Sequence, residues 1–220
     1  MQACLAQFEG YVAAGHSLVQ DGSSWVVIVR RYHPSDQTSF DELWKLRPDD
    51  PPYGTIMGRR VPFPRRTRAF GSDYAFSGQT ADASPIEALP ALARSYRTKT
   101  SIIKLHKLNG VLLNWYDASE GDYIGPHADD EGQLIRGEPI LSITWTSPAT
   151  HFRRFRLLPK KKEDVSLTLD LYDGDLVVMG GRCQTTHKHE IMKSRKRQRD
   201  ECVGRRINQT DRAFRTLSPS

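Results

Sequence analysis

The sequence predicts a mainly β (α+β) fold of the jelly-roll or sandwich type, with two helices packed on its outside. Two helix-start signals precede residue 100, and beyond residue 109 the chain breaks into short apolar or alternating runs separated by Gly, Pro and Asp. No long linker divides the 220 residues, and 38% of them are hydrophobic, enough to bury one sizeable core. We therefore expect one domain over residues 1–220.

Each predicted helix begins with a capping pattern. Ser39-Phe40-Asp41-Glu42 matches a capping box and opens an apolar run that Pro48 stops. Ser84-Pro85-Ile86-Glu87 places Ser at the N-cap, Pro at the first helical position and Glu at N3. The second pattern predicts a helix to about Arg97, which Pro90 could bend.

Eight strands are predicted after residue 109. Their ranges are 111–116, 123–124, 140–145, 152–158, 165–171, 176–179, 186–191 and 206–214. Short strands at this spacing, with turn residues between them, are typical of jelly rolls and sandwiches.

Composition narrows the class of protein. The longest apolar runs, such as Val26–Val29, are far shorter than the roughly 20 residues of a membrane-spanning helix. Residues 1–18 lack the basic and apolar regions of a secretory signal, and three irregularly spaced cysteines argue against a disulfide framework. We expect an intracellular monomer in the nucleus, the cytoplasm or both. The formal charge of +6 suits a polyanionic partner, although many basic proteins have none.

An HxD pair suggests a metal site. His127 and Asp129 follow a predicted strand, and the period-two geometry of a strand would project them to one side. A third ligand would come from the strand at 186–191, where His187 and His189 share a face and compete for the role. Two His and one carboxylate can bind one face of Fe(II) and leave three positions open. Alone, an HxD pair is more often an ordinary surface or core feature.

Two polar strand faces suggest a site for a diacid. Arg206, Asn208, Thr210 and Arg212 alternate along one strand, so burying that face would bury two guanidinium groups, at a cost of several kcal/mol each without an anion. A dicarboxylate such as 2-oxoglutarate would compensate them. Asn114 and Tyr116 share a face of another strand and could bond the same carboxylates. Either face could instead be the solvated side of an edge strand.

Over roughly residues 25 to 216 the chain resembles the AlkB-like Fe(II)/2-oxoglutarate-dependent dioxygenases, in particular their nucleic-acid demethylating branch. The matching motifs are PRRT at 64–67, GSDYAFSG at 71–78, NWY at 114–116, IGPHADDE at 124–131, PI at 139–140, GDLVVM at 174–179, His189 and RINQTDR at 206–212. Two departures stand out. Trp145-Thr146 replaces a small, Gly-containing strand end, and His187 replaces an aromatic residue.

This resemblance implies a double-stranded β-helix (jelly roll) with a nucleotide-recognition region at about 25–100 and a catalytic core at about 109–216. It implies Fe(II), 2-oxoglutarate and O2 as cofactor and co-substrates, and methylated DNA or RNA as the partner, with no membrane involved. The implied iron ligands are His127, Asp129 and His189. The implied 2-oxoglutarate contacts are Asn114, Tyr116, Arg206, Asn208 and Arg212, and the implied base contacts are Tyr74, Phe76 and Glu131.

Alternatives to this function remain open. The chain could oxidise a protein side chain or another substrate that is not a nucleic acid, or it could bind nucleic acid without catalysis. It could also be a metal-binding jelly roll that uses His127, His187 and His189 without 2-oxoglutarate. The basic segment 193–199, with five Lys or Arg in seven positions, would contact phosphates, direct nuclear import or be a solvated loop.

Overall fold

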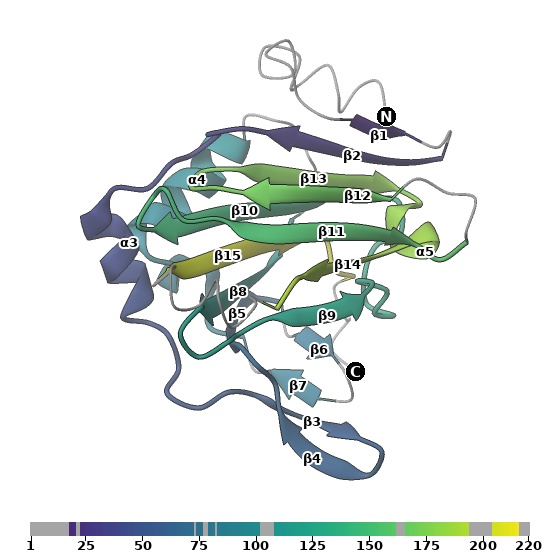
Figure 1. Cartoon of the computed structure of the whole chain (residues 1–220), viewed down its shortest axis with the longest axis horizontal. Helices are drawn as coiled ribbons and strands as arrows, with labels where there is room; N and C mark the ends of the chain where they lie inside the picture. Colours follow the sequence, from purple (N-terminus) through teal and green to yellow (C-terminus); the bar gives the residue numbers. More distant parts are fainter. Residues whose placement is uncertain are drawn as a thin grey trace.

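Two antiparallel sheets face each other and form the body of the protein (Figure 1). The computed structural model describes residues 18–20, 23–72, 74–76, 79–81, 83–101, 108–161, 166–193 and 204–215. The larger sheet has seven strands in the order β1-β2-β13-β10-β15-β8-β5, and the smaller has four in the order β12-β11-β14-β9. The predicted mainly β jelly roll is confirmed.

All eight strands predicted after residue 109 are present. They are β8 (Gly110–Asp117), β9 (Ile124–His127), β10 (Ile140–Ser147), β11 (Arg153–Pro159), β12 (Leu167–Leu171), β13 (Leu176–Gly181), β14 (His187–Ile191) and β15 (Arg205–Arg212). The larger sheet gains three further strands, β1 (Leu18–Gln20), β2 (Ser24–Val29) and β5 (Arg66–Gly71). Thus the segment before residue 100 contributes to the same sheet as the predicted core.

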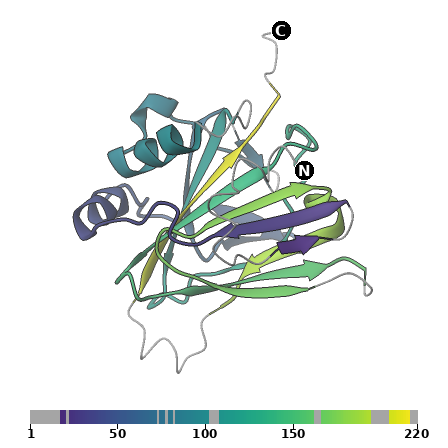
Figure 2. The ribbon, with the colours of Figure 1, turned by 90° about the horizontal axis from the view of Figure 1, so that it is seen from above.

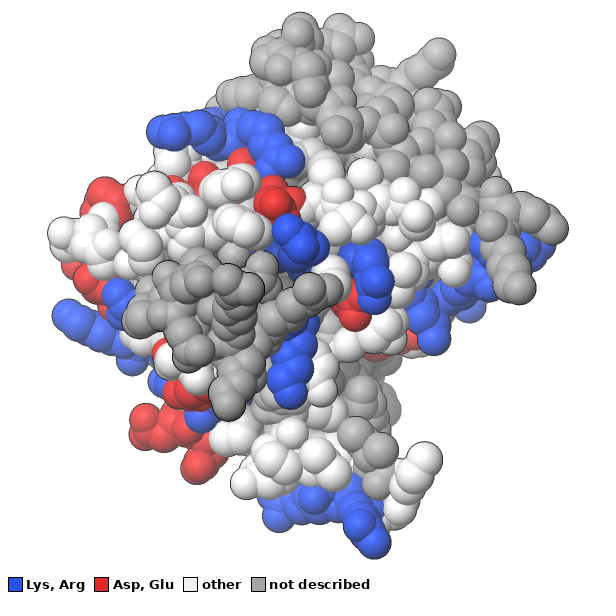
Figure 3. Space-filling model, viewed as in Figure 1, with Lys and Arg blue, Asp and Glu red and all other residues white. Residues whose placement is uncertain are grey.

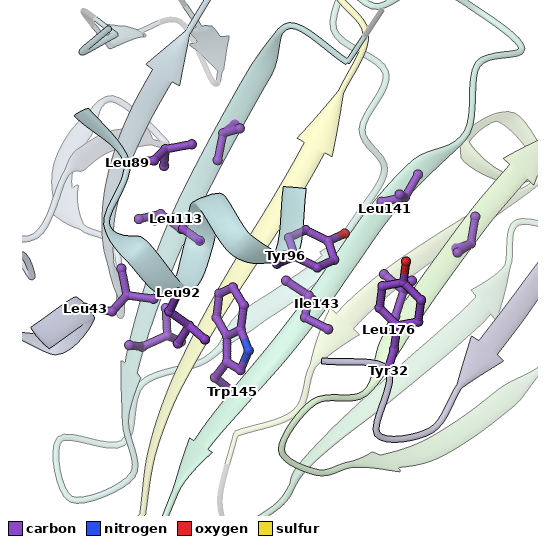
Figure 4. Close-up of a cluster of buried hydrophobic side chains, with 14 of the residues drawn as sticks. Tyr32, Leu43, Leu89, Leu92, Tyr96, Leu113, Leu141, Ile143, Trp145 and Leu176 are labelled. Carbon is purple, nitrogen blue, oxygen red and sulfur yellow. The ribbon is translucent and has the colours of Figure 1, made fainter. Parts of the chain in front are cut away.

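The two longer helices, α3 (Gln37–Trp44) and α4 (Ala91–Ser101), lie together on the outer side of the larger sheet (Figure 2). Alternate residues of its strands, such as Leu113, Ile143 and Trp145, point toward them and form a fully buried apolar layer (Figure 4). The indole N–H of Trp145 donates to the carbonyl of His33 at 2.9 Å, so this polar group is satisfied inside the core. Trp145 therefore packs away from the space between the sheets.

Both helix starts differ from the prediction. The capping box of α3 is formed by Asp36 and Ser39, because the Asp36 carboxylate accepts from the Ser39 N–H at 2.9 Å while the Ser39 hydroxyl accepts from the Asp36 N–H at 3.2 Å. The second segment forms only a 3-10 turn, η1 (Ile86–Ala88), before α4 begins at Ala91. Leu89 is extended, as the residue before a proline prefers, so Pro90 separates the two elements rather than bending one helix.

Two hairpins project beyond the sheets at the end where β9 lies (Figure 1). They are β3 (Tyr53–Ile56) with β4 (Arg59–Pro62), and β6 (Tyr74–Phe76) with β7 (Gln79–Ala81). At the turn of the first hairpin Met57 is 98% exposed and Gly58 has a φ of 76°, a left-handed conformation that glycine adopts without strain. None of the helices in the described part of the chain is both long and apolar enough to span a bilayer.

Candidate metal and co-substrate site

A cavity of about 490 Å³ opens between the two sheets, a volume in the usual range of ligand pockets. Its walls include the inward faces of β8, β9 and β15 together with residues of β11 and β14. Predicted site residues line it, namely Asn114, Tyr116, His127, Asp129, Glu131, His189, Arg206, Asn208 and Arg212. Side chains alternate between the two faces of each strand, and the inward-facing ones line this cavity although some are almost 100 positions apart in the sequence.

The two histidines meet because their strands are neighbours. His127 and His189 are direct Cα partners in the β9–β14 pair, and their ring centroids are 4.2 Å apart. Nδ1 of His127 donates a hydrogen bond to the Gly125 carbonyl at 2.9 Å, so the proton of the neutral ring is on Nδ1 and Nε2 keeps its lone pair for a metal.

Asp129 reaches the histidines from a loop rather than from the strand, because β9 ends at His127. Two contacts hold its carboxylate and backbone in place. Arg212 donates to Oδ2 through Nε at 3.0 Å and through Nη2 at 2.7 Å, and the amide oxygen of Gln184 accepts from the Asp129 N–H at 3.0 Å. Oδ1 remains on the side of His127, 3.7 Å from Nε2.

One potential ligand atom from each of His127, Asp129 and His189 lies within 4.8 Å of the others. Burial lowers the pKa of His127, and burial together with the charge of His127 lowers the pKa of His189 to about 3. Burial alone would raise the pKa of Asp129, but the nearby Arg212 and the two histidines hold it well below its usual range. Neutral imidazoles beside an ionised carboxylate are the donor set that a divalent transition metal requires.

His187 does not join this cluster. It is buried at the start of β14, and its Nδ1 lies 2.7 Å from the Thr186 hydroxyl, which also bonds the Ser24 hydroxyl at 2.7 Å. The competition between His187 and His189 is thus resolved by position along the strand, since only His189 lies opposite His127.

At the inner end of the cavity the guanidinium of Arg206 is buried, with no carboxylate of the described residues paired to it. Arg206 is 2% exposed and its Nη2 donates to the Thr144 hydroxyl at 3.0 Å, whereas Nε and Nη1 have no hydrogen-bond partner among the described residues. Its Cζ lies 5.0 Å from the ring centroid of Tyr116. Burial lowers the pKa of Arg206 to about 10, so the group is still charged at neutral pH. A bound anion would offset the free-energy cost of burying this charge.

The remaining predicted co-substrate residues also line the cavity, each with a protein partner. The Asn114 amide oxygen accepts from Arg65 Nε at 3.3 Å. The Asn208 amide donates to the Ser142 hydroxyl and to the Ile143 carbonyl, both at 2.8 Å. Arg212, in contrast to Arg206, is already paired with a carboxylate, that of Asp129.

The predicted base contacts are described only in part. Glu131 lines the cavity. For Tyr74 and Phe76 the backbone of β6 is described, but their side chains lie outside the described residues. The basic segment is described only at Lys193, whose Nζ lies 5.4 Å from the ring centroid of the cavity-lining Tyr123, and residues 194–199 lie outside the description.

Some residues at the site were not predicted from sequence. Gln184 comes from a single helical turn, α5 (Cys183–Thr186), for which no sequence signal was found. Phe155 stacks on His189 with centroids 5.9 Å apart, and it could have been found, because it occupies an inward position of the alternating strand β11. Thr144, the partner of Arg206, likewise faces inward from β10.

Comparisons with known proteins agree with this geometry. Residues 40–212 match the 2OG-Fe(II) oxygenase superfamily, whose members use Fe(II) and 2-oxoglutarate. The chain is 30% identical over 172 residues to the DNA oxidative demethylase ALKBH2 of Bos taurus, an alignment that covers 75% of this chain and 57% of the relative. For the protein of the same name from Homo sapiens the identity is 31% over 144 residues, covering 62% and 53%. The chain thus spans little more than half the length of these relatives.

The solved structure of OsALKBH1 shares the fold, with a TM-score of 0.53 at 16% sequence identity. The superposition covers 85% of this chain and 97% of that one.

Proposed function

We propose that this chain, which belongs to the 2OG-Fe(II) oxygenase superfamily and is AlkB-like, is an oxidative demethylase that removes N-methyl groups from nucleic-acid bases. In this proposal His127, Asp129 and His189 hold Fe(II), and residues 1–220 act as one catalytic domain. The observation that carries it is the pairing of two features in one cavity. One is a cluster of two partly buried histidines and a buried carboxylate, and the other is a buried guanidinium with two nitrogens that have no partner among the described residues.

These residues fit both groups that the family uses. Three ligands on one side of an ion leave positions open for O2 and for a chelating 2-oxo acid. Arg206, with the Thr144 hydroxyl and Tyr116 beside it, would hold the distal carboxylate of 2-oxoglutarate, and Asn114, Asn208 and Arg212 line the same cavity. When bound, Fe(II) and 2-oxoglutarate supply the oxidation of a C–H bond by O2, with succinate and CO2 as the other products.

The protein's own residues mainly orient and shield this chemistry. The Gly125 carbonyl fixes the proton of His127 on Nδ1, and Arg212 occupies Oδ2 of Asp129, so Oδ1 is the oxygen that would be available to hold the metal. Phe155, Ile191 and Met179 form an apolar wall of the same cavity, which limits water near the reacting centre. A hydroxylated N-methyl group then releases formaldehyde without a further acid or base from the chain.

Support for a nucleic-acid base as substrate comes from the relatives' names and from the charge around the cavity. Lys and Arg gather at the end of the projecting β3–β4 hairpin, where Arg59 and Arg60 are exposed (Figure 3). The chain runs from β4 directly into Phe63, Pro64 and Arg65, which line the cavity. Cations at this position would contact phosphates while a base enters the cavity, and Glu131 would accept from its exocyclic amine.

The direct test is formaldehyde release with Fe(II), 2-oxoglutarate and oligonucleotides that carry single N-methylated bases, in DNA and RNA, single and double stranded. We expect stoichiometric formaldehyde and succinate with at least one of these polymers. If 2-oxoglutarate is consumed while no member of the panel loses its methyl group, and a methylated peptide does, the substrate proposal is wrong although the oxygenase chemistry stands.

The hairpin provides a second prediction. Replacing Arg59 and Arg60 together with glutamine should weaken binding of an oligonucleotide roughly tenfold at low salt and reduce the slope of log K against log salt by about 0.9 per lost duplex phosphate contact. Arg31→Gln with Arg94→Gln removes the same charge elsewhere and serves as the control. An unchanged salt slope in the hairpin variant would rule out phosphate contacts there.

A further inference from the structure

A second buried guanidinium, that of Arg153, lies near Tyr116 outside the lining of the cavity. Arg153 enters from β11 of the smaller sheet and Arg206 from β15 of the larger one. Their Cζ atoms lie 5.8 Å and 5.0 Å from the centroid of the Tyr116 ring. One aromatic ring therefore has a cation from each sheet within the range of a cation–π contact.

Among the described residues, neither guanidinium is directly paired with a carboxylate. Arg153 is 2% exposed, like Arg206, and its Nη2 donates only to backbone carbonyls, to Asp122 at 2.5 Å and to Met192 at 3.2 Å. Its Nη1 has no hydrogen-bond partner in the part of the chain that the structure describes. In the described ranges neither arginine forms an ion pair with a carboxylate, although the charges of Asp122 and Asp117 partly offset the cost of burying Arg153. Two buried like charges with so little compensation are expected to cost several kcal/mol.

His151, the nearby imidazole, adds no positive charge at neutral pH. Its ring packs against Gly204, where an added Cβ would lie 2.2 Å from the ring and force one of the two to shift. Burial, and then the charges of Arg153 and Arg206, lower the pKa of His151 to about 4. The positive charge near this end therefore comes from Arg153 and Arg206, both of which lie close to the Tyr116 ring.

We propose that Arg153 is a specificity-determining positioning residue: through Tyr116 and alongside Arg206, it makes the inner end of the cavity select a 2-oxo acid that carries a second carboxylate. The inference rests on the co-substrate half of the proposed function and not on its methylated base. Arg153 itself does not line the cavity, so it acts by its charge and by holding Tyr116, while Arg206 and Tyr116 face the ligand.

A purely structural role for Arg153 makes a different prediction. Its two carbonyl contacts join the loop before β9 to the end of β14, and their loss could loosen the whole cavity. Loosening would weaken every ligand to a similar degree. A charge effect would weaken only ligands with a distal carboxylate.

The test compares two ligands of equal chain length, 2-oxoglutarate and 2-oxopentanoate, which differ in the distal carboxylate. Their dissociation constants are measured by calorimetry on Mn(II)-loaded protein without oxygen or nucleic acid. In Arg153→Gln we expect affinity for 2-oxoglutarate to fall about tenfold, equivalent to about 1.4 kcal/mol, and that for 2-oxopentanoate to change less than twofold. Arg154→Gln, the outward-facing neighbour that pairs with Asp170, is the control.

Arg153→Lys retains the charge but not the geometry of the carbonyl contacts. If the glutamine variant does not fold, the same two dissociation constants are measured on the lysine variant. We expect it to keep most of the preference for 2-oxoglutarate. Equal losses for both ligands in Arg153→Gln, no loss for either, or a lysine variant without the preference would each overturn the proposal. Because no nucleic acid is present, these outcomes are independent of whether the methylated-base assay succeeds.

Discussion

Replacing Asp129 with asparagine is expected to lower turnover at least about a thousandfold, or roughly 4 kcal/mol of transition-state stabilisation. The substitution keeps the shape of the side chain but removes the one anionic ligand of the cluster. Arg212, whose two N–H groups are directed at Oδ2, would then be an uncompensated positive charge beside the metal position. Affinity for a divalent cation should also fall, because an anionic ligand is lost and a positive charge beside the metal position is no longer compensated.

Succinate formation and equilibrium binding of Mn(II) measure the two effects separately. Asp170→Asn, on the outer face of the smaller sheet, is the control for removal of a carboxylate from the chain. Binding of an oligonucleotide should be nearly unchanged, because Asp129 is buried and its neighbours hold the loop. Formaldehyde release by Asp129→Asn at the rate of the unmodified chain would exclude Asp129 as a ligand.

Arg206→Met is expected to weaken 2-oxoglutarate binding about a hundredfold, or roughly 2.7 kcal/mol, while leaving the unliganded protein as stable as before or more stable. The two effects have opposite signs for one reason. Without an anion two nitrogens of the buried guanidinium, Nε and Nη1, have no partner among the described residues, so a similarly sized apolar side chain removes an unfavourable group. With the diacid bound, the same change leaves a carboxylate unpaired.

Thermal unfolding of Mn(II)-loaded protein with and without 2-oxoglutarate measures both quantities: the stability of the unliganded protein and the stabilisation by the ligand. The unmodified chain should gain stability with ligand, and Arg206→Met should gain almost none. Arg205→Gln removes the neighbouring charge, which pairs with Asp41 on the other side of the strand at 2.9 Å, and should retain the full ligand effect. A destabilised variant that still binds the diacid would mean that Arg206 has a structural partner instead.

Local pattern predicted the parts of the site that lie on regular strands. Alternation along β15 placed Arg206, Asn208 and Arg212 on one face, and the fold directs that face inward as expected. β2 was not predicted as a strand, because Val26–Val29 is buried on both faces and a continuous apolar run has no alternation to detect. β5 also lacked a recognised signal.

Contacts between distant segments could not be predicted from the sequence. Whether His187 or His189 joins the cluster depends on the β9–β14 register, which pairs His189 with His127. Asp129 lies beyond the strand, and its position depends on Arg212 and Gln184, which are 83 and 55 residues away. The proximity of Arg153 and Arg206 to Tyr116 requires the two sheets to face each other.

The most direct test of the site is an anaerobic titration of the metal-free protein with Fe(II) and then 2-oxoglutarate, followed by visible absorption. Chelation of Fe(II) by a 2-oxo acid produces a charge-transfer band. We predict that the band saturates at one Fe(II) per chain, is absent in Asp129→Asn and needs far more 2-oxoglutarate in Arg206→Met. No band in the unmodified chain, or an undiminished band in Asp129→Asn, would contradict the assignment of this cavity as the iron and 2-oxoglutarate site.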